Sequence, residues 1–105
     1  MNIQQLAQKI ELQEDECVEL LRLFIETSSR DLELLDTAIA RGDMKEAWEA
    51  AHSLKGSAVS LGLDAFSDSA KNIETEAKHG RISSVSEDIR FLRTQLDEIG
   101  ASVGS

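Results

Sequence analysis

Apolar residues recur at intervals of three and four along most of the chain, and no stretch alternates between apolar and polar with a period of two. This spacing is typical of amphipathic helices, whose apolar stripes face a common core. Four such stripes are present, and a shorter apolar segment precedes them. The helices that they predict cover about residues 14–41, 47–61, 66–77 and 85–99, with a short helix at about 3–10 that Asn2 would cap.

Glycines mark the expected breaks between these helices. The chain has no proline, and four of its 6 glycines fall almost evenly where helices need C-terminal caps: Gly42, Gly62, Gly80 and Gly100. The first three are followed by residues able to begin the next helix: Asp43 with Glu46, Asp64, and Ser84 with Glu87 as a capping box. Residues 101–105 are expected to fray.

Four amphipathic helices joined by short loops fold most simply into an all-α, up-down-up-down antiparallel four-helix bundle, with the short N-terminal helix across one end. A chain of 105 residues holds one hydrophobic core and has no room for two. We therefore expect a single domain over residues 1–105, and a monomer. A start at Met1 and an end soon after the last helix favour a stand-alone protein.

Composition excludes several classes of function. The chain has 20 acidic and 11 basic residues and a net charge of −9, whereas nucleic-acid binding needs a basic surface. The N-terminus lacks a secretion signal, and no apolar run approaches the roughly 20 residues of a membrane span. Cys17 is the sole cysteine and lies in a core stripe, so it is expected to be a small apolar side chain in a reducing compartment. We expect a cytoplasmic protein that binds neither nucleic acid nor membranes.

One segment departs from the pattern of a simple bundle helix. Gly56 lies in the middle of a predicted helix, where glycine costs about 1 kcal/mol relative to alanine and so needs a packing or functional reason. At about 100° per residue, His52 points away from the core stripe, and Gly56 follows it one turn later on the same face. Lys55 lies beside them. An exposed imidazole with an uncrowded approach and a nearby positive charge is suited to accept a phosphoryl group.

The following helix adds a carboxylate at the same level. With the turn centred on residues 62–63, the position opposite His52 is about residue 73, which brings Glu74 close to the imidazole. There it would accept a hydrogen bond from Nδ1–H and leave Nε2 free as the nucleophile. It would also favour the protonated ring, which is not nucleophilic. Three lysines near this edge would oppose that effect and face the incoming phosphoryl group: Lys55, Lys71 and Lys78.

The run AHSLKGSAVSLG, from Ala51 to Gly62, resembles the signature A-H-x-L-K-G-S-[AS]-x-x-L-G of histidine-containing phosphotransfer (HPt) domains. That family consists of small acidic four-helix bundles with the histidine midway along the second bundle helix, so the resemblance extends over most of the chain. It implies that His52 is phosphorylated on Nε2, that Lys55 assists the phosphate and that Gly56 admits the partner. Glu74 occupies a position where relay members often carry glutamine and the phosphotransfer domains of chemotaxis kinases carry glutamate.

The resemblance also implies partners in a two-component phosphorelay. His52 would exchange its phosphoryl group with an aspartate of a response-regulator receiver domain, or receive it from a sensor or hybrid histidine kinase. The receiver supplies Mg²⁺ and most of the catalysis, so no bound cofactor or metal is expected in the chain itself. No glycine-rich nucleotide-binding loop is present, and we expect no autophosphorylation with ATP. Trp48 and Val59 would offer apolar contact to a partner, although packing alone explains both.

Two other interpretations fit parts of the sequence. Glu49 with His52, and Glu76 with His79, have the Glu-x-x-His spacing of di-iron bundles. In the expected bundle, however, His79 lies about 9 Å beyond the level of His52 and His52 faces outward, so the pairs do not meet; His79 is better explained as a cation at a helix C-terminus. The other interpretation is a protein-interaction bundle in which His52 has no chemistry, and a phosphorylation test separates it from phosphotransfer.

Overall fold

The computed structural model describes residues 1–104, and this range contains helices and no strand. The all-α class is therefore confirmed. The elements are α1 (Ile3–Lys9), α2 (Glu14–Arg41), α3 (Met44–Ser60), α4 (Asp64–Lys78), the short 3-10 helix η1 (Ile82–Ser84) and α5 (Ser86–Ser102). None of the helices within residues 1–104 combines the length and apolar character that a membrane span needs.

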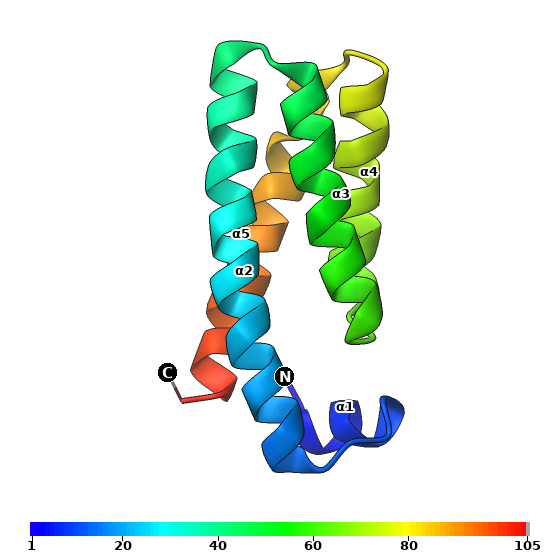
Figure 1. Ribbon diagram of the computed structural model, residues 1–105, viewed down its shortest axis with the longest axis vertical. Coiled ribbons are helices and arrows are strands. Elements are labelled where there is room, and N and C mark those ends of the chain that lie inside the picture. Colours follow the sequence, from blue (N-terminus) through cyan, green and yellow to red (C-terminus); the bar gives the residue numbers. More distant parts are fainter. Residues whose placement is uncertain (105) are drawn as a thin grey trace.

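The four long helices lie side by side in Figure 1, and α1 lies at the end where α2 begins. In this view the chain ascends along α2, descends along α3, ascends along α4 and descends along α5. The molecule is elongated, with extents of 41 × 22 × 18 Å. Lys9 ties α1 to the turn between α3 and α4, because its Nζ donates to the carbonyl of Gly62 at 2.6 Å and to Asp64 at 2.7 Å.

The core is built from the apolar stripes that the periodicity predicts. Phe24 and Phe66 meet edge to face between α2 and α4, with ring centroids 5.0 Å apart. Cys17 is fully buried, and burial, with a smaller contribution from the charge of Glu14, raises the pKa of its thiol. The largest fully buried apolar side chains come from all four long helices and the residue that precedes α5: Leu21, Leu35, Leu54, Phe66, Ile73, Val85, Leu92 and Ile99.

Two of the expected helix starts and the first three glycine breaks, at Gly42, Gly62 and Gly80, are confirmed. Asn2 accepts a hydrogen bond from the backbone N–H of Gln5 at 2.9 Å, and Asp43 accepts one from that of Glu46 at 3.1 Å. Gly42 ends α2 in the left-handed region at φ +70°, where a side chain would be strained. The short connection it allows brings α3 back directly along α2.

The expected N-terminal caps of the last two bundle helices are wrong. Asp64 is the first residue of α4, after Leu63, and its carboxylate binds Lys9 instead of capping the helix. Ser84 does not begin α5, because its hydroxyl donates to Glu76 at 3.3 Å and α5 starts at Ser86. Val85, the residue directly before α5, is buried.

The expected end of the last helix is also wrong. Gly100 lies inside α5, which continues to Ser102. Residues 101–104 do not fray, because Val103 is buried and its carbonyl accepts a hydrogen bond from Arg22 on α2 at 3.0 Å. Residue 105, the last of the segment expected to fray, lies outside the described residues.

Candidate functional site

His52 projects from the middle of α3 into solvent. Its side chain is 57% exposed, whereas its neighbours Ala51 and Leu54 are fully buried. Because these two residues anchor the inner face of α3, the rotation of the helix leaves the imidazole on the outer face. The sequence predicts this orientation correctly.

Glu74 of α4 lies at the level of His52, as the position of the turn predicts. Its Oε2 is 2.5 Å from Nδ1 of His52 and its Oε1 is 2.9 Å from Nζ of Lys55, so one carboxylate bridges two residues of α3. The glutamate side chain is only 12% exposed. When Nδ1 carries the proton of this bond, the lone pair on the other ring nitrogen, Nε2, is free.

The carboxyl group of Glu74 is held in its charged form. Burial by itself would raise the pKa of Glu74, but the hydrogen bonds from Lys55 and His52, together with their charges, outweigh burial and keep the pKa below its ordinary value. A negative charge therefore lies permanently against Nδ1 at neutral pH. It favours any form of the ring that carries a positive charge.

Gly56 presents open space one turn after His52. A Cβ built on Gly56 would meet nothing within 4 Å, and the residue is exposed. Packing within the chain therefore gives no reason for glycine at this position. Val59, the next residue along the same face, is 61% exposed.

The lysines of the site differ in their surroundings. Lys55 is 28% exposed and is paired with Glu74, while Lys78 lines a hollow of about 290 Å³ beside His52 together with Glu74, Thr75 and His79. Lys71 is exposed on α4 and, within the described residues, forms no ion pair or hydrogen bond with the other site residues. Lys55 thus shares the carboxylate of Glu74 with the imidazole and Lys78 shares a hollow with it, whereas Lys71 does neither among the described residues.

Charge differs between the two sides of α3. Lys55 and Lys78 lie on the side of α4, whereas Ser53 donates to Asp31 of α2 at 2.7 Å on the opposite side. Asp31 shares a small hollow there with Glu46 and Glu49. The lysines that share a partner or a hollow with His52, Lys55 and Lys78, therefore lie on the α4 side of α3.

Trp48 stacks on His52, which sequence reasoning missed. The two ring centroids are 5.3 Å apart and the planes differ by 13°. The spacing of four residues on one helix was the available signal, since side chains lean toward the helix N-terminus and residue i+4 approaches residue i.

A second feature that sequence reasoning missed is an apolar groove between α2 and α3. Leu20 and Leu23 are exposed, and with Phe24 and Leu61 they line a hollow of about 360 Å³ that Ser57 and Ser60 of α3 border. The signal was the doubled apolar positions at residues 20–21 and 23–24, which widen the stripe of α2 beyond what the core buries.

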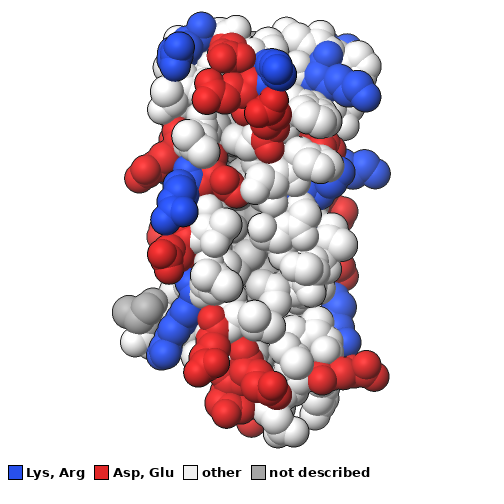
Figure 2. All heavy atoms as spheres, in the orientation of Figure 1, with Lys and Arg blue, Asp and Glu red and all other residues white. Residues whose placement is uncertain are grey.

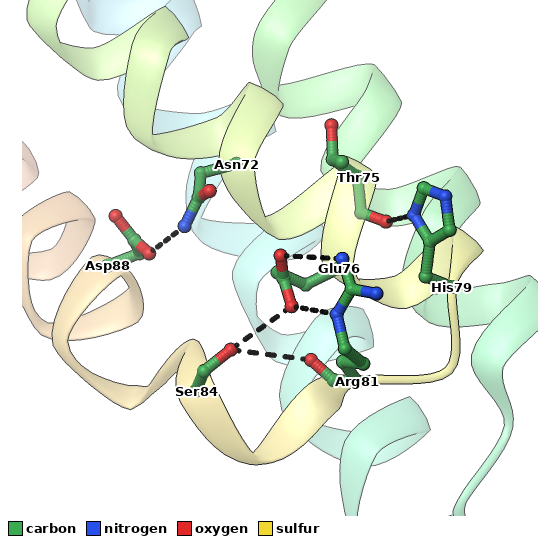
Figure 3. Close-up of polar contacts among 7 residues, drawn as sticks. All are labelled: Asn72, Thr75, Glu76, His79, Arg81, Ser84 and Asp88. Carbon is green, nitrogen blue, oxygen red and sulfur yellow. Dashed lines mark hydrogen bonds and ion pairs between the residues drawn. The ribbon is translucent and has the colours of Figure 1, made fainter.

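The Glu-x-x-His pairs do not form a metal site. Glu76 binds Arg81 at 3.0 Å and Ser84 at 3.3 Å, and Nδ1 of His79 donates to the carbonyl of Thr75 at 2.8 Å (Figure 3). The hydrogen bond and charge of Arg81 keep the pKa of Glu76 below its ordinary value. These residues hold the turn after α4, and within residues 1–104 no group of three or more histidine, cysteine, aspartate or glutamate side chains is placed to hold a metal ion.

Most of the chain matches a known protein family. The family model of the Hpt domain matches residues 19–102. This range includes His52, Glu74 and the four long helices apart from the first residues of α2, and it leaves out α1. No curated protein and no solved structure gave a match. The match spans far more than half of the chain, and the chain therefore belongs to the Hpt domain family, whose helical bundles carry out histidine phosphotransfer in phosphorelays.

Proposed function

We propose that His52 is the phosphoacceptor of this domain. It takes a phosphoryl group from the aspartyl phosphate of a receiver domain, or from a histidine kinase, and passes it to the aspartate of a response-regulator receiver. The observation that carries the proposal is the contact between Glu74 and Nδ1 at 2.5 Å on an imidazole that is itself 57% exposed. That contact leaves Nε2 as the nucleophilic nitrogen.

The transfer step follows from this arrangement. The lone pair of Nε2 attacks phosphorus, the N–P bond forms, and the bond between phosphorus and the aspartate oxygen breaks with its electron pair going to the aspartate carboxylate. The ring keeps its proton on Nδ1 and so gains a positive charge. Glu74 stabilises that charge through the hydrogen bond it already accepts. The reverse sequence delivers the group to the next aspartate.

The neighbouring residues have distinct proposed roles. Lys55 holds the Glu74 carboxylate in position, and its charge, with that of Lys78, attracts the phosphoryl oxygens. Lys71 contributes at longer range. Gly56 leaves the space through which the receiver brings its phosphorylated aspartate close to Nε2.

We place the receiver on the face that α2 and α3 present. Exposed Val59 and the groove bordered by Leu20 and Leu23 continue the surface around Gly56 toward α2. Figure 2 shows that the middle of this face carries mostly uncharged side chains, with charged ones gathered toward its ends and edges. A largely uncharged centre that exposes Leu20, Leu23 and Val59, with a charged rim, is typical of a protein interface.

The relay module that we propose is a monomeric, cytoplasmic up-down-up-down bundle without a cofactor of its own. Mg²⁺ would enter with the receiver domain, whose aspartate undergoes the chemistry on the other side of the interface. The chain would not phosphorylate itself with ATP. Its part is to present one oriented imidazole.

The test compares two histidine variants. Receiver domains from the same genome, each phosphorylated with radiolabelled acetyl phosphate, are incubated with the wild type, His52→Gln and His79→Gln. We expect acid-labile label on the wild type and equally on His79→Gln, and none on His52→Gln. Equal labelling of His52→Gln, or a receiver that binds the wild type without labelling it, would overturn the proposal.

A further inference from the structure

The chain has one tryptophan and no tyrosine, and that tryptophan lies against the proposed phosphoacceptor. The indole of Trp48 and the imidazole of His52 are stacked nearly parallel, 5.3 Å apart and at 13°. We propose that Trp48 is a positioning residue, which fixes the plane of the His52 ring and thereby the direction of Nε2. This inference rests on the proposed function of His52.

The hydrogen bond to Glu74 does not orient the ring by itself. A single contact at Nδ1 fixes one atom of the imidazole, but the ring can still pivot about that contact, because the side chain is 57% exposed and χ2 of histidine is a broad torsion. A flat aromatic surface on one face of the ring removes this pivot. Glu74 and Trp48 together therefore hold the imidazole at an edge and at a face, which leaves the other face and the edge with Nε2 open.

Trp48 is itself anchored, as a positioning residue must be. It is partly buried and packs against the core, and it lines a second hollow together with Met44, Ala77 and Lys78. It also lines the hollow that His52 and Glu74 border. An indole that packs against the core is a stiffer support than the exposed ring that stacks on it.

The stack also suits the phosphorylated state. After transfer the ring carries a positive charge, and a cation over the face of an indole is attracted by the negative π-face. Trp48 thus stabilises the positively charged imidazole through contact with the face of the ring, and Glu74 stabilises it through the hydrogen bond at the ring edge. Because the face of the indole is occupied by His52, apolar contact with a partner is not needed to explain this tryptophan.

The functional test compares Trp48→Leu with Trp48→Phe. Leucine keeps apolar bulk without a flat face, and phenylalanine restores an aromatic face. With a phosphorylated receiver domain as donor, we expect kcat for transfer to fall roughly three- to tenfold in Trp48→Leu, with KM nearly unchanged, and to recover largely in Trp48→Phe. Phe91→Leu, which removes a partly buried aromatic ring from α5 outside the site, is the matched control and should transfer at the wild-type rate.

Two outcomes of this comparison would overturn the inference. A rise in KM with unchanged kcat would show that Trp48 contacts the receiver, and a wild-type rate in Trp48→Leu would show that the stack has no role. Urea unfolding of each variant identifies any loss that arises from a weaker fold. If the wild type takes up no label from any receiver, then the proposed function itself fails.

A measurement without any partner tests the geometry separately. In the His79→Gln background His52 is the sole histidine, and its ring protons should resonate upfield of free histidine because they lie over the indole. The shift should vanish in Trp48→Leu and persist in part in Trp48→Phe. Ring protons at their free-histidine positions in the Trp48-containing protein would overturn the stacking, whatever the transfer rates.

Discussion

Replacing Glu74 by glutamine removes one negative charge from His52 and preserves the size of the side chain. The amide oxygen of glutamine can still accept the hydrogen bond from Nδ1–H, so the tautomer and the position of the ring are kept. The substitution therefore separates the charge of Glu74 from its geometry. It acts mainly on the phosphorylated state, in which the ring is positively charged.

The expected magnitude follows from the contact at 2.5 Å. A hydrogen bond to a charged group contributes about 1.5–3 kcal/mol and a neutral one about 0.5–1.5 kcal/mol, so the charge adds about 1–1.5 kcal/mol. Because the imidazole is 57% exposed, solvent screening reduces this to about 0.7–1 kcal/mol. The equilibrium constant for transfer from receiver to His52 should thus fall about three- to fivefold in Glu74→Gln.

One effect of the same substitution has the opposite sign. Nζ of Lys55, 2.9 Å from Glu74, loses its partner, and its released charge would attract the phosphoryl group. We expect the loss at His52 to be larger, since Glu74 contacts the ring directly whereas Lys55 contacts the carboxylate. Lys55→Met removes the competing effect, and in that background the fall should be at least as large.

The assay mixes equal amounts of phosphorylated receiver and Hpt protein and measures the label on each at equilibrium. Glu74→Gln is compared with the wild type, and Lys55→Met/Glu74→Gln with Lys55→Met. A transfer constant that stays the same or rises on loss of the carboxylate in the Lys55→Met background would refute the electrostatic role of Glu74.

Three further predictions concern stability. Because the pKa of Glu74 is lowered in the folded state, its carboxylate stabilises the fold above the pKa of an unfolded-state glutamate, and this stabilisation is lost as the pH falls through the lower folded-state pKa. The difference in free energy of unfolding between wild type and Glu74→Gln, measured in urea, should therefore shrink in acid. A difference that stays constant with pH would contradict this prediction. Ser28 Oγ is fully buried without a hydrogen-bond partner among the described residues, so Ser28→Ala should raise the free energy of unfolding by about 1 kcal/mol, whereas destabilisation would reveal a partner. Gly56→Ala should stabilise the protein by about 1 kcal/mol in thermal unfolding, because alanine favours the helix and meets no neighbour there. Gly56→Gln should fold normally but transfer the phosphoryl group at least about tenfold more slowly. A Gly56→Gln variant that transfers as fast as wild type would remove the proposed role of Gly56.

The features that the sequence predicts well are those set by helical periodicity. Which face of α3 is buried follows from Ala51, Leu54 and their neighbours in the stripe, and the outward direction of His52 follows from it. The level of Glu74 follows from the length of the α3–α4 turn, because two antiparallel helices advance equally per residue. Neither inference needs the conformation of a side chain.

The features that it misses depend on competition between local contacts. Ser84 has the pattern of a capping residue, but its hydroxyl binds Glu76, which also holds Arg81. Gly100 has the pattern of a helix stop, but α5 continues to Ser102, and the burial of Val103 with its hydrogen bond from Arg22 stabilises this end of the chain. The stack of Trp48 on His52 depends on the rotamers of both rings, which spacing alone does not determine.

The most direct test of the central claim is the identity of the phosphorylated atom. The protein with ¹⁵N-labelled histidine is phosphorylated chemically with phosphoramidate and observed by heteronuclear NMR, which distinguishes an N–P bond at Nε2 from one at Nδ1. We predict a bond at Nε2 of His52, with the proton retained on Nδ1 beside Glu74. Phosphorylation at Nδ1, or at His79 with His52 unmodified, would contradict the account.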